Sequence, residues 1–235
     1  AILRRIYRSL LSANIGIERN PFESELVVVP AAKSGQKRPT EMIQYEKVGE
    51  ILSLPDCSTA KGLRDHAILS VLFGAGLRRS ELIKLRLADV RRSSRGNVYI
   101  RLRATKGKRD ADQAVPAWAA KSLLELVEQR KQARAGAGDY VFVGFSGQGG
   151  RAATNRPISS AGLYQVFKQY CLLAGAGLFA SPHSARATAI TKLLDAGFSH
   201  REVQEFSRHA SVEMVEVYDK RRYSVDENPG LGLEY

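Results

Sequence analysis

The segment from Arg208 to Arg222, RHASVEMVEVYDKRR, places Tyr218 nine residues after His209 and among basic side chains. Val215 and Met214 lie three and four residues before Tyr218, which predicts one shared helical face and a structural role for the phenol in a core. The alternative is that the phenol is a nucleophile. The two interpretations require different surroundings for Tyr218, so the rest of the chain must decide between them.

Length and charge narrow the class of protein. The chain has 235 residues, enough for one large domain with an apolar core. Its 36 Lys and Arg exceed its 24 Asp and Glu, and the net charge of +12 indicates a polyanionic partner, with nucleic acid the first candidate. A solvated basic surface is the structural alternative.

Cysteine content and hydropathy exclude other classes. Cys57 and Cys171 belong to no CxxC motif or Cys/His cluster, so we expect neither a disulfide framework nor a zinc site, and no cofactor. No stretch approaches the roughly 18 consecutive apolar residues of a membrane span, so we expect no membrane partner.

Several segments indicate how the chain is divided. Residues 2–17 carry apolar side chains at helical spacing, and Pro21 ends that pattern. One helix cannot bury its own apolar stripe, so it should belong to a domain that begins earlier. We expect four parts: the last helix of an N-terminal DNA-binding domain (1–24), a linker (25–42), a catalytic domain (43–222) and a C-terminal tail (223–235).

The second domain alternates helical and strand patterns. Helices are predicted at 45–54, 61–76 and 79–87, and short strands at 97–105, 114–117 and 140–145. Helical periodicity then returns from 158, with Ser159 or Ser160 as N-cap. The sequence therefore predicts a mostly α domain with a small antiparallel β-sheet, an α+β fold.

A glycine-rich stretch could suggest a nucleotide cofactor. Gly147, Gly149 and Ala152 fit the GxGxxA pattern of dinucleotide-binding proteins. No helix can follow directly because Pro157 comes within a few residues, and no acidic strand end lies about 20 residues further on. We therefore expect a flexible loop. The chain also has no GxxxxGK[ST] motif for nucleotide hydrolysis.

Six polar residues in four short stretches are the strongest functional signal. Taken singly, each has a structural explanation: the arginines could pair with Glu81 or Asp89, the histidines could be satisfied in a core, and the lysine could be a solvated hairpin charge. Their joint order and spacing favour a shared site instead. The stretches are GAGLRRSELIKL with Arg78, RATKGKRD with Lys106, SPHSARATAI with His183 and Arg186, and FSRHASVEMVEVYDK with His209 and Tyr218.

These stretches resemble the boxes of the tyrosine recombinase family, of the phage-integrase type. GLRRSEL is similar to the family's GLRxSEL, HSARAT to HxLRHT, and RHASVEMVEVY to LGHxxxxxTxxY, over about residues 43–222. The sequence departs from the pattern at Ala185, at Ala187 and at Ser207-Arg208. None of these departures removes a group that the chemistry needs.

The resemblance implies a DNA breaking and rejoining domain and assigns roles to its residues. Arg78 and Arg186 would clamp a phosphate, since a guanidinium donates to two oxygens at once. Tyr218 would be the nucleophile and Lys106 the general acid for the 5′-hydroxyl. His183 would act as base or hydrogen-bond donor, His209 would hydrogen-bond the phosphate, and Glu81 would orient an arginine or histidine.

The resemblance also implies partners and a location. It implies double-stranded DNA at specific recombination sites, a homo-tetramer on DNA from a chain that is monomeric in solution, and a cytoplasmic, nucleoid-associated protein of bacterial, archaeal or phage origin. The tail would dock on a neighbouring protomer. Candidate backbone-contacting residues are Arg79, Arg91, Arg92, Arg95, Arg101, Arg103, Lys108, Arg151 and Arg156.

Two other functions stay open on sequence. One is a type IB topoisomerase-like or telomere-resolving enzyme, which would use the same residues. The other is an accessory DNA-binding protein that keeps the fold and does not cut DNA. The presence of all six polar residues argues against the second.

Overall fold

The computed structural model describes residues 40, 42–103, 110–146 and 152–219. The chain divides into two compact units, residues 1–38 and 39–235, and every described residue belongs to the second. The helix expected at 2–17 and the tail at 223–235 therefore lie outside the described residues, as does most of the linker expected at 25–42.

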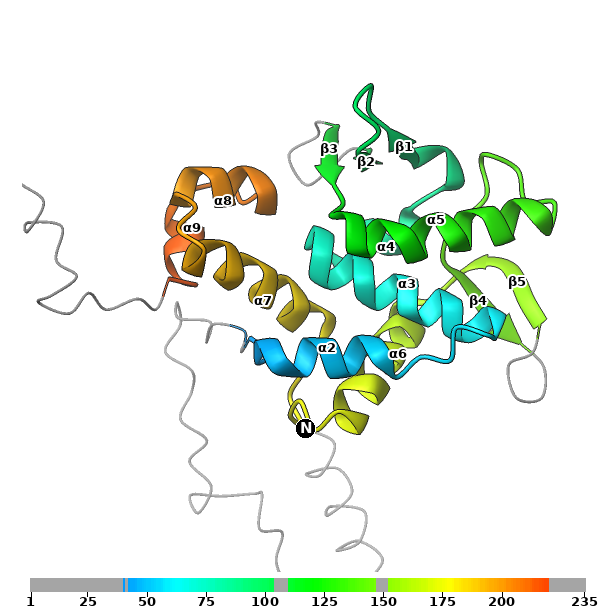
Figure 1. Ribbon diagram of the computed structural model, residues 1–235, viewed down its shortest axis with the longest axis horizontal. Helices are drawn as coiled ribbons and strands as arrows, with labels where there is room; N and C mark the ends of the chain where they lie inside the picture. Colours follow the sequence, from blue (N-terminus) through cyan, green and yellow to red (C-terminus); the bar gives the residue numbers. More distant parts are fainter. Residues whose placement is uncertain (1–39, 41, 104–109, 147–151, 220–235) are drawn as a thin grey trace, which may run out of the picture. The chain divides into compact units, whose positions relative to one another are not determined.

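The described residues form a mostly helical domain with small antiparallel sheets, which confirms the predicted fold class. Figure 1 shows the helices gathered around α3, with the strands at the periphery. The elements are α2 (Tyr45–Ser53), α3 (Ala60–Ala75), α4 (Arg79–Lys84), the 3₁₀ turn η1 (Leu87–Asp89), β1 (Val90–Arg92), β2 (Val98–Leu102), β3 (Ala111–Ala114), α5 (Ala117–Gln132), β4 (Val143–Ser146), β5 (Ala152–Pro157), α6 (Ser160–Leu173), α7 (Pro182–Asp195), α8 (His200–Ser207) and α9 (Glu213–Glu216).

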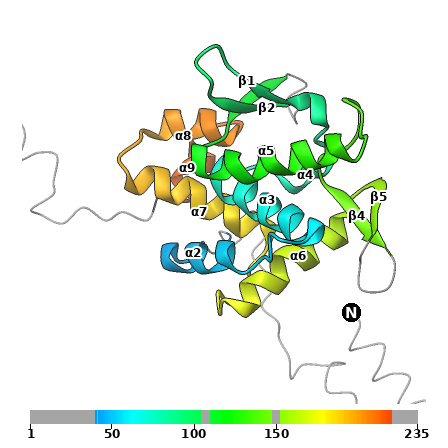
Figure 2. The same cartoon turned by 45° about the vertical axis from the view of Figure 1, so that its right-hand side comes forward.

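Helix α3 is the centre of the core. It is buried on almost all sides: residues 67–75 are almost all apolar, and the polar Arg64 and Asp65 of its first half are buried as an ion pair. Thr59 caps its first turn by accepting a hydrogen bond from the Gly62 amide, and Gly76 ends it in the left-handed conformation with φ 57°. Helix α5 runs alongside α3 in both views (Figures 1 and 2).

The three-stranded sheet has the order β1-β2-β3, with Leu102 opposite Ala111. The strand predicted at 114–117 is displaced, because Pro116 has no amide proton for the sheet and instead serves as the N-cap of α5. The sequence interpretation did not include α5. The segment that joins β2 to β3 contains Lys106, which lies outside the described residues.

The strand predicted at 140–145 overlaps β4, whereas the loop expected around Gly147, Gly149 and Ala152 gives way to β5 from Ala152 onward. β4 pairs with β5 in antiparallel register, so the polar ATNRP segment is a strand and the loop prediction was wrong there. The hairpin is tied to the start of α3, because the buried Arg64 donates to the Val143 carbonyl at 2.9 Å. Residues 147–151, with two of the three GxGxxA positions, are not described.

The C-terminal helices carry most of the site. Ser159 caps α6 by accepting from the Gly162 amide, which confirms it as an N-cap. Helix α9 ends at Glu216, so Tyr218 follows a single helical turn. Tyr218 packs against a small cluster of Ile190, Leu194, Val203 and Val215, whereas Met214 is 47% exposed. None of the described helices is long and apolar enough to cross a membrane.

Candidate active site

Arg78 is held at the start of α4 by its own helix. Its backbone amide donates to Oε2 of Glu81 at 2.7 Å, and its Nη1 donates to Oε1 of the same carboxylate at 2.8 Å. Its Nη2 donates to the carbonyl of Arg208 at 2.7 Å. Arg79 is exposed on the first turn, so the structure places Arg78 in the cluster and Arg79 outside it.

Arg186 lies on α7 and is only 1% exposed. Its Nη1 donates to the Gly76 carbonyl at 2.6 Å and its Nη2 to the Ser207 carbonyl. Burial, followed by the charges of Arg78 and Arg208, lowers the pKa of Arg186 to about 9. This guanidinium therefore carries a positive charge that its surroundings do not fully balance.

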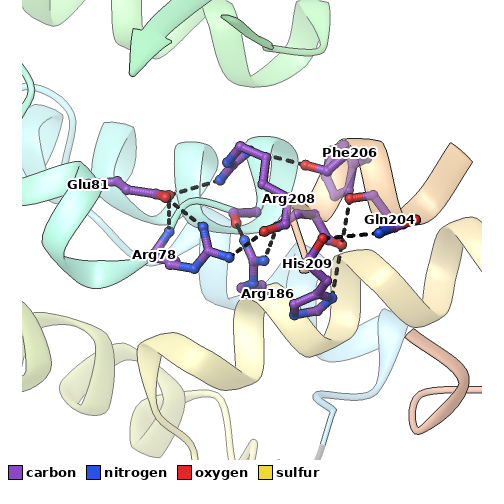
Figure 3. Close-up of polar contacts among 9 residues, drawn as sticks. Arg78, Glu81, Arg186, Gln204, Phe206, Arg208 and His209 are labelled. Carbon is purple, nitrogen blue, oxygen red and sulfur yellow. Dashed lines mark hydrogen bonds and ion pairs between the residues drawn. The ribbon is translucent and has the colours of Figure 1, made fainter. Parts of the chain in front are cut away.

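Both arginines retain unused donors. A guanidinium has five N–H groups, and the described residues accept from Arg78 through Glu81 and the Arg208 carbonyl, and from Arg186 through two carbonyls. The Nε of Arg186 is buried without a hydrogen-bond partner among the described residues. Figure 3 shows Arg186 between Arg78 and His209. A tetrahedral anion at this point could accept hydrogen bonds from both guanidinium groups.

Tyr218 and His209 lie against each other. Their rings are nearly parallel, with centroids 5.8 Å apart and an interplanar angle of 13°. Nδ1 of His209 is 3.0 Å from the Ser207 hydroxyl, and the His209 amide donates to the Gln204 carbonyl at 3.3 Å. These contacts fix the orientation of the imidazole, and the imidazole covers one face of the phenol.

The electrostatics of the site favour neutral partners around the arginines. Burial raises the pKa of the Tyr218 phenol, and the nearby charge of Arg186 opposes that rise. Burial, then Arg186 and Arg78, lower the pKa of His209 to about 4. Burial and the same two arginines lower the pKa of His183. At neutral pH the phenol is therefore protonated and both imidazoles are neutral.

The other predicted site residues fall into two groups. Lys106, Lys108 and Arg151 lie outside the described residues. Among those described, Arg101 pairs with Asp110 at 3.4 Å and Arg103 with Asp89 at 2.8 Å, while Arg91, Arg92, Arg95 and Arg156 are exposed. Asp89, which the sequence analysis considered as a salt-bridge partner for Arg78 or Arg186, pairs with Arg103 instead. No group of three or more His, Cys, Asp or Glu side chains in the described part of the chain could hold a metal ion.

The sequence interpretation did not identify Arg208 as a residue of this cluster. Arg208 contributes both its carbonyl, which accepts from Arg78, and its guanidinium, which pairs with Glu81 at 2.8 Å. Sequence had marked this position only as a departure from the Leu-Gly of the family box. The sequence signal that could have identified it is an arginine at a helix end, where glycine is favoured.

This arrangement defines a class of protein. A mostly helical domain gathers three guanidinium groups, one carboxylate and neutral imidazoles beside a tyrosine, which is a site suited to holding a phosphate next to a hydroxyl nucleophile. The chain belongs to the phage integrase family, whose pattern it matches over residues 41–224. The resemblance to tyrosine recombinases is thereby confirmed.

Curated relatives carry matching names. The chain is 30% identical to "Tyrosine recombinase XerD" of Listeria innocua over 198 residues, which cover 82% of this chain and 62% of that protein. It is 33% identical to "Tyrosine recombinase XerC" of Myxococcus xanthus over 183 residues, covering 76% and 57%. The chain thus spans less than two thirds of the length of these relatives.

Solved structures show the same fold. The crystal structure of XerA recombinase matches with a TM-score of 0.63 at 24% identity, covering 80% of this chain and 62% of that one. The Tn1549 transposon integrase, in complex with circular intermediate DNA, matches with a TM-score of 0.64 at 17% identity, covering 98% and 76%.

Proposed function

We propose that this chain carries the catalytic domain of a site-specific DNA recombinase, which cleaves and rejoins strands through a covalent 3′-phosphotyrosyl intermediate without metal or ATP. One observation carries the proposal. Arg78 and Arg208 share a single carboxylate, Glu81, and the nearby Arg186 donates to the Gly76 and Ser207 carbonyls, so two positive charges are unbalanced beside a tyrosine. A phosphodiester would supply the missing negative charge and accept the unused donors.

The reaction exchanges one phosphoester for another. With the phosphate held between Arg78 and Arg186, the Tyr218 oxygen forms a bond to phosphorus as the bond to the 5′-oxygen breaks. His183, neutral because its pKa is lowered, accepts the phenol proton. Lys106, on the segment between β2 and β3, gives a proton to the departing 5′-oxygen. Attack by another 5′-hydroxyl reverses the steps, and no energy source is needed because the number of ester bonds is unchanged.

Because burial raises the pKa of the Tyr218 phenol, a base must accept its proton during the attack on the bound phosphate. Tyr218 alone would stay protonated at neutral pH. His209 would donate to a non-bridging oxygen through Nε2–H, which a neutral imidazole carries when Nδ1 accepts from the Ser207 hydroxyl. A nearby phosphate would raise the pKa of His209 from its low value, because the anion offsets the charges of Arg186 and Arg78.

A nicked suicide substrate tests this proposal. The DNA would carry the site recovered by sequencing the fragments bound by the full-length protein, with a nick that lets the 5′-hydroxyl fragment diffuse away. The chain should form a covalent adduct, and Tyr218→Phe should form none. Equal adduct yields from both proteins would remove Tyr218 from the mechanism. A wild-type protein that binds this DNA without forming an adduct would favour the accessory DNA-binding function.

Substrate and assembly follow from the same proposal. Double-stranded DNA is the proposed partner, in line with the net charge of +12. Solved relatives include XerH bound to its difH substrate. We propose that four copies assemble on paired sites. Relaxation of a supercoiled plasmid that carries no paired sites would favour a type IB topoisomerase-like activity instead.

A further inference from the structure

Arg208 occupies a backbone position that suits glycine. It is the C-cap of α8, with φ 55° and ψ 40° in the left-handed region. A side chain with a Cβ is strained there, which raises the question of what the contacts of the Arg208 side chain contribute. Among the described residues, the other non-glycine residue with positive φ is Arg134, an exposed residue after α5 with φ 62°.

The Arg208 side chain reaches back into the phosphate-binding cluster. Its Nη2 donates to Oε2 of Glu81 at 2.8 Å, and its Nη1 donates to the Phe206 carbonyl at 3.0 Å. The side chains of both Arg208 and Glu81 are largely buried, at 11% and 10% exposed, so solvent screens the pair weakly. Figure 3 shows Arg78 and Arg208 reaching the same carboxylate.

Sharing this carboxylate changes what Arg78 can do. If Glu81 paired with Arg78 alone, the two charges would cancel and Arg78 would offer little attraction to a phosphate. Because Arg208 takes up part of the carboxylate's charge, the three groups together keep one net positive charge. The Arg208 carbonyl also holds Nη2 of Arg78, so residue 208 contacts Arg78 directly and through Glu81.

We propose that Arg208 is a positioning residue of the phosphate clamp: by sharing Glu81 and accepting from Arg78, it keeps the Arg78 guanidinium oriented, with its positive charge only partly offset, for the DNA phosphate. This inference rests on the proposed function and adds a residue to it. Arg208 precedes His209, so the same contacts couple the segment leading to Tyr218 to the start of α4.

The test compares Arg208→Gly with Arg134→Gly. Both changes remove one arginine from a left-handed position, so loss of charge and relief of strain are matched. Arg208→Gly should lower the rate of adduct formation by about tenfold or more, and Arg208→Lys should recover part of it. Arg134→Gly should stay within about twofold of wild type. Equal rates for both glycine variants would overturn the inference.

A double-mutant cycle shows whether Arg208 acts through Glu81. In a Glu81→Gln background, Arg208→Gly should lower the adduct rate by less than about threefold, because the shared carboxylate charge is already gone. The same four proteins should show a coupling of about fivefold in the unfolding equilibrium constant. Additive effects in both measurements would show that the two side chains act independently, which contradicts the inference.

A binding measurement separates this inference from the proposed function. In a Tyr218→Phe background no cleavage occurs, so anisotropy with a 30-base-pair duplex reports binding alone. Arg208→Gly should weaken binding at least about threefold more than Arg134→Gly. An equal loss would mean that Arg208 contributes charge without positioning, and the inference would fail. If wild type forms no adduct yet this difference is seen, the cleavage proposal fails and the clamp inference stands.

Discussion

The surroundings of the site arginines disfavour their positive charges. Arg186 is almost fully buried, near two other guanidinium groups, and its pKa is lowered to about 9. A core that served stability alone would avoid such crowding, since replacing buried charges by apolar groups is often neutral or stabilising. The unbalanced charge is therefore best explained by an anion that completes the site.

This explanation predicts stabilisation by a small anion. Sulfate should occupy the site between Arg78 and Arg186, and should raise the free energy of unfolding by about 1.4 kcal/mol at ten times its Kd. Urea denaturation in sulfate and in chloride at matched ionic strength measures the gain. Arg78→Gln should lose most of it while keeping the general salting-out effect of sulfate. The same gain in both proteins would place the anion elsewhere.

His209 makes stability depend on pH. Its pKa is lowered to about 4 in the folded protein, against about 6.5 for an unfolded histidine. The unfolded chain therefore binds the proton more readily, so stability is present above pH 6.5 and is lost as pH falls toward 4.

Between pH 7 and pH 5, protonation of His209 should lower the free energy of unfolding by about 1–2 kcal/mol, after allowance for solvent screening of a half-exposed ring. Urea denaturation at pH 7 and pH 5 measures it. His209→Asn should show a shallower decline, and the remaining slope belongs in part to His183 and His66, whose pKa values are also lowered. An identical slope in wild type and His209→Asn would contradict this assignment.

At the residue scale, motif spacing predicted which side chains meet. Arg78, Arg186, His209 and Tyr218 are assembled as their boxes suggested, whereas the position of Lys106 stays a prediction. Arg208 could not be found from spacing, because its role depends on a left-handed backbone that brings its carbonyl and side chain to the same neighbours.

At the scale of elements, apolar periodicity predicted the buried helices α2 and α3 correctly. It did not predict elements whose formation depends on strand pairing or on a helix cap. α2 and α3 carry clear patterns and begin and end near the predicted residues. β5 has little strand propensity and exists because it pairs with β4, a contact that local sequence does not encode. The helix α5 was missed because Pro116 was assigned to a strand, although proline is common at helix starts.

The end of α3 matters for the site, because the carbonyl of Gly76 accepts from Arg186. A Cβ at Gly76 would lie 3.1 Å from the ring of Phe206, at a φ of +57°. Gly76→Ala should therefore lower the free energy of unfolding by about 2 kcal/mol, from the strained backbone and the crowded ring, and should reduce adduct formation.

Gly175→Ala is the matched control. Gly175 also has a positive φ, +65°, but no atom lies within 4 Å of its added Cβ. It should lower the free energy of unfolding by about 1 kcal/mol and leave adduct formation unchanged. Urea denaturation and the suicide substrate measure the two effects. A Gly76→Ala protein no less stable than Gly175→Ala would show that Phe206 moves aside at no cost.

At the scale of the whole molecule, the described domain leaves an apolar groove of about 760 Å³ between α2, α3, α5 and α7. Its lining includes Val48, Leu52 and Val98, as well as Trp118, which is 50% exposed. The tail contributes Leu231, Leu233 and Tyr235 within a few residues of each other. Under the proposed assembly, the tail of one copy would cover these side chains on a neighbour.

Deleting residues 226–235 should then weaken assembly on DNA with paired sites, and Trp118→Glu should weaken it to a similar degree, because a charge in the groove opposes burial of the tail. Binding to DNA with a single site should change little. Tyr164→Glu, on the exposed face of α6 and outside the groove, controls for the added charge. Sedimentation of protein with single-site and paired-site duplexes measures all four proteins. If the deletion weakens assembly and Trp118→Glu does not, the tail contacts another surface, and if neither has an effect, assembly does not depend on the tail.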